Sequence, residues 1–187
     1  LPLDTHQARI GIKPLFDTNG LAEGEAASFE VVMLGPDGKP LPSANLRWEL
    51  KRIESRWQWY SRDGSWNYEL AKFTRKAGDG TVDVRDGAPA KISVKPDWGR
   101  YRLEVSRADG QPSGASDGAA SVTFDSGYWG SDNLDSPEML EVALDKTAYK
   151  AGETAKVTVA AQAPGRAMVA VLGRGLVSMH EATLTGK

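Results

Sequence analysis

An internal repeat is the feature that most constrains the fold of this chain. When the 187-residue sequence is compared with itself, Gly24-Glu25 recurs as Gly152-Glu153, 128 positions later, and other residues match at the same offset. The further matched pairs are Ile12 with Leu140, Phe16 with Leu144, Asp17 with Asp145, Leu21 with Tyr149, Ala27 with Ala155, Phe29 with Val157, and Val31 with Val159. We therefore expect two domains of one kind to follow each other.

Each copy of the repeat has the pattern of an opening β-hairpin. An apolar strand ends in Asp, a turn carries a large apolar residue, and Gly-Glu leads into a second alternating strand. The first copy finishes with Trp98–Val105, in which Tyr101, Leu103 and Val105 point one way and charged residues the other, as in the penultimate strand of an immunoglobulin-like sandwich. No such finish occurs in the second copy before Lys187, so we expect its remaining strands beyond this sequence.

Alternation of apolar and polar residues dominates the whole chain, and helical patterns are scarce. The strands that this alternation predicts are Ala8–Pro14, Ala27–Leu34, Asn45–Ile53, Arg56–Tyr60, Trp66–Thr74, Ala90–Lys95, Gly99–Arg107, Ala119–Asp125, Leu140–Leu144, Ala155–Ala161, Arg166–Leu172 and Leu176–Thr185. Turns are predicted at Pro36-Asp37-Gly38, Asp63-Gly64, Asp79-Gly80, Asp86-Gly87 and Asp109-Gly110. The predicted fold is all-β, with immunoglobulin-like antiparallel β-sandwiches in tandem.

The domain boundary is expected where alternation is lost and Gly, Ser, Asp and Asn gather. We assign residues 1–127 to a first sandwich with a Trp-rich hairpin, 128–136 to a linker, and 137–187 to the N-terminal part of a second sandwich. Because position 1 is not Met and no signal-peptide pattern follows it, we expect Leu1 to be an interior point of a longer chain.

Composition excludes several classes of function. The net charge of −2, with no block of five like charges, lacks the basic surface of a nucleic-acid-binding protein. No apolar run approaches the roughly 18 residues of a membrane span. The absence of cysteine excludes disulfides, thiolate metal sites, cysteine nucleophiles and a thioester within this segment.

Catalytic and metal sites find no support in the sequence. His6 and His180 are the only histidines and lie in different predicted domains, and no Ser sits in a Gly-x-Ser-x-Gly elbow. Two groups of acidic residues have no calcium-loop spacing and are interpreted as solvated turn carboxylates. These residues are Asp79, Asp83 and Asp86 in one group, and Asp125, Asp132 and Asp135 in the other.

The aromatic residues around the Asp63-Gly64 turn form the candidate interaction surface. They are Trp57, Trp59, Tyr60, Trp66 and Tyr68. Pairing across a hairpin is the favoured interpretation, contact with a neighbouring domain is second, and stacking on sugar rings is third. Trp48, which lies between Leu46 and Leu50, is assigned to the core.

Several strings resemble the bacterial α2-macroglobulin family. The segment Leu144–Val159 resembles the opening of a macroglobulin domain, Gly165–Val171 its next strand, and Trp57–Tyr60, Trp66–Glu69 and Trp98–Val105 the bacterial members in particular. The resemblance implies tandem macroglobulin domains in a large periplasmic lipoprotein of the inner membrane, which traps proteases after they cleave a bait segment. The Cys-x-Glu-Gln thioester motif of many members is absent from this segment.

The resemblance also implies partners and a role for this segment. It implies proteases, met through the parent protein, and neighbouring macroglobulin domains; a cell-wall synthase is a further candidate. The leading hypothesis is a structural, interaction-making segment of a protease inhibitor, with no catalytic activity and no cofactor. The alternative is a tandem immunoglobulin-like module of an adhesin or cell-wall glycan-binding protein, which the aromatic residues would suit. An enzyme such as a glycoside hydrolase lacks an identifiable pair of facing carboxylates.

Overall fold

The computed structural model describes residues 8–19, 21–41, 43–85, 87–108, 119–129, 140–161 and 163–185. These residues form strands and their connections, which confirms the predicted all-β class. Within the described ranges, no helix is long and apolar enough to cross a membrane. The chain divides into two compact units, Leu1–Glu54 with Lys72–Gly127, and Ser55–Ala71 with Tyr128–Lys187.

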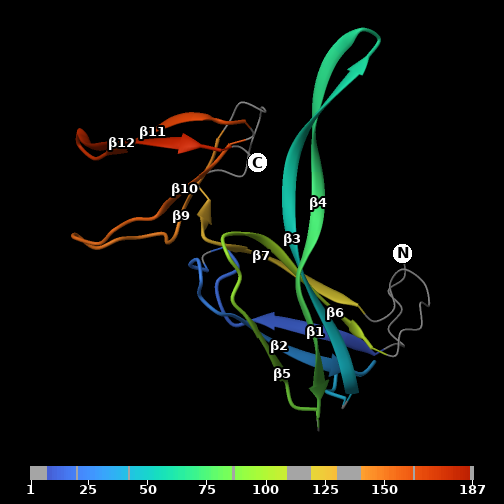
Figure 1. Ribbon diagram of the computed structural model, residues 1–187. Coiled ribbons are helices and arrows are strands. Elements are labelled where there is room, and N and C mark those ends of the chain that lie inside the picture. Colours follow the sequence, from blue (N-terminus) through green and yellow to red (C-terminus); the bar gives the residue numbers. More distant parts are fainter. Residues whose placement is uncertain are drawn as a thin grey trace. The chain divides into compact units, whose positions relative to one another are not determined.

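The first unit is built on two β-sheets (Figure 1). One has the order β1-β2-β5, from β1 (Arg9–Pro14), β2 (Ala27–Leu34) and β5 (Ala90–Val94). The other has the order β4-β3-β6-β7, from β3 (Ser43–Arg62), β4 (Ser65–Val84), β6 (Gly99–Arg107) and β7 (Ala120–Ser126). The β1–β2, β2–β5, β3–β6 and β6–β7 pairs are antiparallel, as an immunoglobulin-like sandwich requires.

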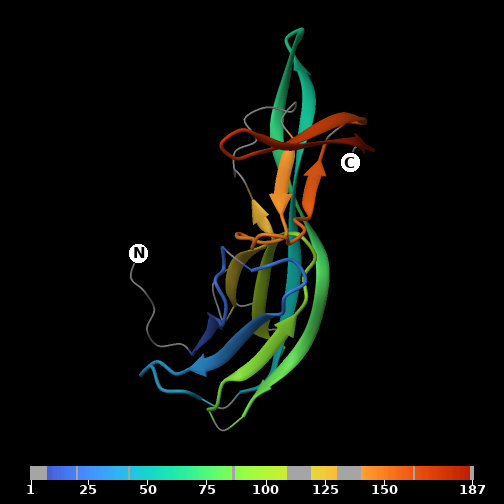
Figure 2. The same ribbon diagram turned by 90° about the vertical axis from the view of Figure 1, so that its left-hand side faces the viewer.

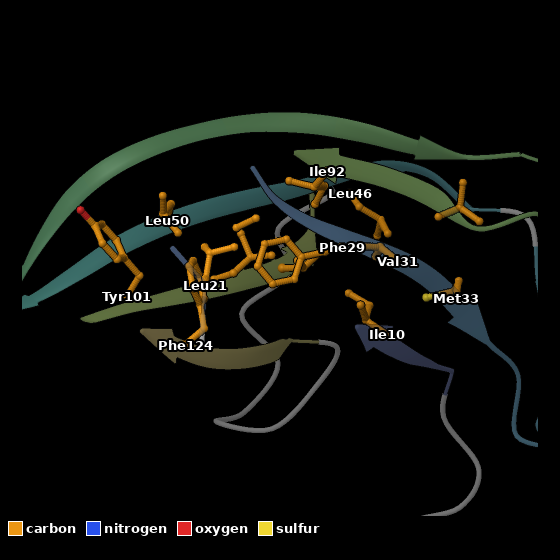
Figure 3. Packing of buried hydrophobic residues seen from close by; sticks show 14 residues of the cluster. Ile10, Leu21, Phe29, Val31, Met33, Leu46, Leu50, Ile92, Tyr101 and Phe124 are labelled. Atoms are coloured by element: carbon orange, nitrogen blue, oxygen red, sulfur yellow. The ribbon is translucent and has the colours of Figure 1, made fainter. Parts of the chain in front are cut away.

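The core of this unit joins side chains from both sheets (Figure 3). Burial alternates strictly along β2 and β6, and the predicted inward residues Tyr101, Leu103 and Val105 are all buried. Phe29 of β2 and Phe124 of β7 are buried, with ring centroids 5.4 Å apart. The alternating pattern therefore places one face of each sheet in a common apolar layer.

The strands β3 and β4 are longer than the alternation predicts, with 20 residues each (Figures 1 and 2). The predicted break between Ile53 and Arg56 does not occur. The predicted turn at Asp79-Gly80 is also wrong, because both residues lie within β4. A Cβ added at Gly80 would lie 2.9 Å from the Trp48 ring, so this glycine serves close packing of Trp48 against the strand. Trp48 is half-buried and packs against the core, as expected.

The other predicted turns divide into those that the structure describes and those that it does not. Gly38 and Gly64 have φ values of 76° and 79°, and both lie in turns as predicted. Gly87 has φ 71°. Asp86 and the predicted Asp109-Gly110 turn lie outside the described residues.

The C-terminal part of the second unit consists of short strands. One sheet has the order β10-β9-β8, from β8 (Tyr128–Trp129), β9 (Glu141–Leu144) and β10 (Val157–Ala160). A hairpin follows, from β11 (Gly165–Leu172) and β12 (Leu176–Leu184). The backbone of Tyr128–Trp129, in the expected linker, pairs with β9. The rest of the expected linker, residues 130–136, lies outside the described residues.

The repeated Gly-Glu turn has the same geometry in both copies. Gly24 and Gly152 have φ values of 80° and 88°, which favour glycine. The Glu25 carboxylate accepts a hydrogen bond from the Ala22 N–H at 3.3 Å, and the Glu153 carboxylate accepts one from the Lys150 N–H at 3.0 Å. The glutamates thus close equivalent turns 128 residues apart, and their repetition has a structural cause.

Strand register differs between the copies by two residues. Pro14 lies opposite Phe29 in the first copy, whereas Leu144, the counterpart of Phe16, lies opposite Val157 in the second. A shift of two residues leaves every side chain on its original face of the sheet. Equivalent side chains in the two copies therefore lie on the same face of their sheets, although the residues that they pair with differ by two positions.

Candidate functional site

The predicted aromatic residues lie at the far end of the β3–β4 hairpin. This end, Ser55–Ala71, belongs to the second compact unit. A two-residue loop closes it, with Asp63 at φ 53° and Gly64 at φ 79°. Positive φ at both positions is the requirement of a tight two-residue hairpin turn, which Asp-Gly sequences meet at little cost. The turn therefore determines which side chains of the two strands share a face.

Four of the five predicted residues lie on one face of this hairpin. The Tyr68 ring packs against the Trp57 ring at a centroid distance of 5.1 Å and against the Trp59 ring at 5.2 Å, edge to face in both cases. Since side chains two positions apart share a face, Trp66 and Leu70 join Tyr68. We call Trp57, Trp59, Trp66, Tyr68 and Leu70 the aromatic face. Tyr60 alternates onto the opposite face, so the predicted set is divided.

The aromatic face is exposed to an unusual degree for large apolar side chains. Trp66 is 72% exposed and Trp59 is 56% exposed. Trp57 is half-buried, and its buried indole Nε1 has no hydrogen-bond acceptor among the described residues. Such a surface favours an apolar partner, because contiguous exposed aromatic side chains mark interaction sites. Its use as an interaction surface stays a prediction.

Residues considered for metal binding or catalysis occupy structural positions. Asp79 pairs with Lys76 at 3.0 Å. Asp83 accepts a hydrogen bond from the Asn45 N–H at 2.9 Å, and this bond lowers the pKa of its carboxyl below the usual 3.8. His180 lies 3.2 Å from the Ser178 hydroxyl and is exposed. No group of three or more His, Cys, Asp or Glu suited to a metal ion occurs in the part of the chain that the structure describes.

Three acidic residues differ from their interpretation as turn carboxylates, because Asp79 and Asp83 are exposed residues within β4 and Asp125 is a strand residue with a partner. Asp125 lies within β7 and accepts two hydrogen bonds from the Arg100 guanidinium, at 2.8 and 3.1 Å. The two residues are directly opposite in the β6–β7 register, which explains the bidentate pair. His6, Asp86, Asp132 and Asp135 lie outside the described residues.

A second exposed apolar surface, not predicted from the sequence, lies on β11 and β12. Met168, Ala170 and Leu172 share one face of β11, and the residues opposite the last two are Met179 and Leu176. We call these five residues the methionine face. Leu172, Met168 and Met179 are 73%, 67% and 52% exposed. On the other face Ala167 is buried, whereas Val171 is 44% exposed. Alternation alone could have identified the two faces, but not which of them is exposed.

Comparison with known proteins relates this chain to the macroglobulins. The family model described as Bacterial macroglobulin domain 6 matches residues 11–128. The α2-macroglobulin of Xylella fastidiosa (strain 9a5c) is 34% identical over 173 residues, which cover 88% of this chain and 10% of the relative. The α2-macroglobulin of Escherichia coli (strain K12) is 29% identical over 151 residues, which cover 77% of this chain and 9% of the relative.

Solved structures agree with this relation. The native conformation of E. coli α2-macroglobulin superimposes with a TM-score of 0.55 at 24% identity, over 95% of this chain and 12% of that one, which shows a shared fold. E. coli α2-macroglobulin activated by porcine elastase gives a TM-score of 0.53 at 28% identity, over 74% of this chain and 11% of that one. This chain spans about a tenth of the length of these relatives.

Proposed function

This chain belongs to the bacterial α2-macroglobulin family, and from that premise we propose that it is a structural, interaction-making segment of a protease-trapping inhibitor and not an enzyme. The observation that carries the proposal is the match of the macroglobulin domain model to residues 11–128, which include strands β1 to β7. Because the chain spans about a tenth of its relatives, trapping is a property proposed for the parent protein.

The proposed mechanical role is that of a stiff element. Phe16, Phe29, Phe124 and Tyr101 make edge, tilted or stacked ring contacts at centroid distances of 5.2–5.8 Å across the sandwich. Close-packed interiors deform little and pass displacement on to their contacts. A segment of this kind would hold bait and trapping elements in their uncleaved geometry and transmit the rearrangement after cleavage.

The proposed partners and location follow from the family. The E. coli relative was solved after activation by porcine elastase, and another of its structures after activation by trypsin. We therefore propose proteases as targets of the parent protein, and neighbouring macroglobulin domains as contacts of this segment. A periplasmic location, with the parent anchored as a lipoprotein, is also proposed. Contact with a cell-wall synthase stays a prediction from the resemblance.

A trapping assay on the parent protein tests the proposal. The parent is incubated with porcine elastase, and hydrolysis of a small chromogenic peptide is compared with hydrolysis of casein. A trap encloses the protease, so peptide hydrolysis is expected to persist while casein hydrolysis falls. Equal loss of both activities would indicate ordinary active-site inhibition, and unchanged casein hydrolysis would indicate no trap; either result would overturn the proposal.

The matched control uses elastase with a covalently blocked active site. It cannot cleave a bait segment, so the parent should remain in its original form on a native gel. A change of mobility with blocked elastase would show that binding alone, without cleavage, drives the rearrangement, against the proposal.

A further inference from the structure

We propose that five apolar residues of the second repeat copy form an uncovered core face, and that a strand of the parent protein equivalent to β7 covers it. We call Val142, Leu144, Ala155, Val157 and Val159 the open face. Val142 lies opposite Val159 and Leu144 lies opposite Val157, so these four side chains share one face of the β9–β10 pair. Ala155 precedes Val157 by two positions. The proposal goes beyond protease trapping and does not depend on it.

The first step compares burial at equivalent positions of the repeat. In the first copy, three core residues of β2 are 0% exposed, namely Ala27, Phe29 and Val31. In the second copy, their counterpart Ala155 is exposed, Val157 is 36% exposed and Val159 is half-buried. Within the residues that the structure describes, the core face of the repeat is therefore buried in the first copy and open in the second.

The second step identifies what covers this face in the first copy. Figure 3 shows Phe124 of β7 beside Phe29, with ring centroids 5.4 Å apart. The Phe124 ring also lies 5.3 Å from the ring of Phe16, whose counterpart in the second copy is Leu144 of the open face. Sheets with one apolar face are stable when a second layer covers that face. In the first copy, β7 provides this layer for the residues that the open face repeats.

The third step concerns hydrogen bonds to the opening turn of the repeat. In the first copy, N–H groups at and just after the end of β7 donate to the Thr18 carbonyl at 2.9 Å and to the Leu21 carbonyl at 2.8 Å. The counterparts in the second copy are Lys146 and Tyr149, and no N–H of the described residues donates to their carbonyls. An occupant that fills the open face and donates to both carbonyls has the chemistry of a polypeptide strand.

The turn that would receive this strand is held by its own side chains. The Tyr149 hydroxyl donates to the Asp145 carboxylate at 2.5 Å, and the Lys146 ammonium pairs with Glu153 at 2.8 Å. An ordered turn lowers the entropy cost of docking. Relatives are about ten times longer than this chain, so the parent has the length for further strands, and a tethered strand meets the face at high effective concentration. We therefore assign the cover to a strand that follows Lys187 and corresponds to β7.

Cysteine labelling tests the cover, since this chain has no native cysteine. The variants Ala155→Cys and Val157→Cys probe the open face, and Ala27→Cys is the buried reference. The matched control is Thr154→Cys, because Thr154 and its counterpart Ala26 are both exposed and the repeat predicts that this position stays exposed. Each variant is made in the 187-residue chain and in the parent, and its reaction with a maleimide is followed by peptide mass spectrometry. Far-UV circular dichroism checks that each variant is folded.

In the 187-residue chain, both open-face cysteines should react about as fast as Thr154→Cys, whereas Ala27→Cys should react slowly. In the parent, both should react on the order of tenfold more slowly than Thr154→Cys, because a covered thiol reacts only after local opening. Equal rates for the open-face cysteines and Thr154→Cys in the parent would overturn the proposal. Protection already present in the 187-residue chain would also overturn it, because residues of this chain or a second copy would then cover the face.

Photocrosslinking in the parent identifies the occupant. Val157 corresponds to Phe29, so Val157→p-benzoylphenylalanine places an aromatic side chain where the first copy has one. The control Phe29→p-benzoylphenylalanine should crosslink to the β7 peptide that contains Phe124. For the Val157 variant, we expect a crosslink to a peptide that follows Lys187 and has the alternating pattern of a strand. A crosslink to a peptide before Leu1, to residues of this chain or to a second copy would overturn the proposal, as would no crosslink when the control reacts.

Discussion

Among single residues, Lys51 lies between two carboxylates that the sheet places opposite each other. Glu49 of β3 lies directly across from Glu104 of β6. The Lys51 ammonium is 2.6 Å from the Glu104 carboxylate and 3.7 Å from that of Glu49. The hydrogen bond to Glu104 raises the pKa of Lys51 above its usual 10.5. Like charges directly opposite in a sheet are destabilising, and this lysine offsets them.

We predict that Lys51→Met lowers the free energy of unfolding by roughly 0.5–1 kcal/mol at pH 7, the scale of a partly exposed ion pair. A raised pKa means that the stabilisation is complete below pH 10.5 and is lost as the pH rises through the raised value. The difference between wild type and variant should therefore stay constant from pH 7 to about pH 10 and shrink above it. Urea unfolding at several pH values measures the free energy of unfolding of wild type and Lys51→Met, and exposed Lys95→Met is the control. A difference between wild type and Lys51→Met that grows above pH 10 would contradict this role of Lys51.

The unsatisfied indole of Trp57 gives a second prediction at this scale. Trp57→Phe keeps an aromatic ring against Tyr68 and removes a buried N–H that has no acceptor among the described residues. We expect stability to be unchanged or higher by about 1 kcal/mol, since an unsatisfied buried donor costs roughly 1–3 kcal/mol. Trp57→Ala, which also removes the ring contact, should instead lower stability by roughly 1–3 kcal/mol. Urea midpoints compare the two, and a clear loss in Trp57→Phe would show that the N–H has a partner in solution.

At the scale of elements, the length of β4 depends on its glycines. A Cβ at Gly80 would lie 2.9 Å from three atoms of the Trp48 ring, whereas one at Gly78 would lie at an ordinary 3.7 Å. We predict that Gly80→Ala costs about 1–3 kcal/mol because it overpacks this contact. Gly78→Ala should be neutral or stabilising by about 0.4–1 kcal/mol through reduced unfolded-state entropy. Thermal unfolding of both variants checks the difference, and equal effects would contradict the packing role of Gly80.

Strands could be predicted from the sequence where their position depends on nearby residues, and not where it depends on contacts with distant strands. Alternation between clear turns predicted β2 and β6 to the residue, because one face of each strand is buried along its whole length. It failed at Asp79-Gly80, where a turn-forming pair serves a contact with Trp48 from a distant strand. Asp125 was likewise misassigned, because its partner Arg100 is apparent only once β6 and β7 pair.

The candidate site was predictable in part for the same reason. The Asp63-Gly64 turn and period-2 alternation place Trp57, Trp59, Trp66 and Tyr68 together. The ring contacts confirm that pairing for Trp57 and Trp59 with Tyr68. Tyr60 was grouped with them by sequence proximity, although its parity assigns it to the other face. The methionine face was not predicted, because alternation shows that the hairpin has two faces but does not show which of them is covered.

At the scale of the whole molecule, the stability of the first unit depends on one aromatic cluster. Phe124 is 1% exposed and contacts Phe16, Phe29 and Tyr101, with centroids 5.3–5.8 Å away. We predict that Phe124→Ala lowers the free energy of unfolding by about 3–5 kcal/mol, the range for large cavities in packed cores. The exposed neighbour Thr123→Ala should change it by less than about 0.5 kcal/mol. Denaturant titration tests both, and similar effects of the two substitutions would show that the cluster is not the core of this unit.

The proposed function makes this chain a scaffold segment of a parent protein that rearranges when a protease cleaves it. Small-angle X-ray scattering of the parent protein, before and after treatment with porcine elastase, tests this rearrangement. We expect a smaller radius of gyration after cleavage, while circular dichroism shows that the parent retains its strand content. An unchanged radius after complete cleavage, or a larger one with loss of strand content, would contradict it.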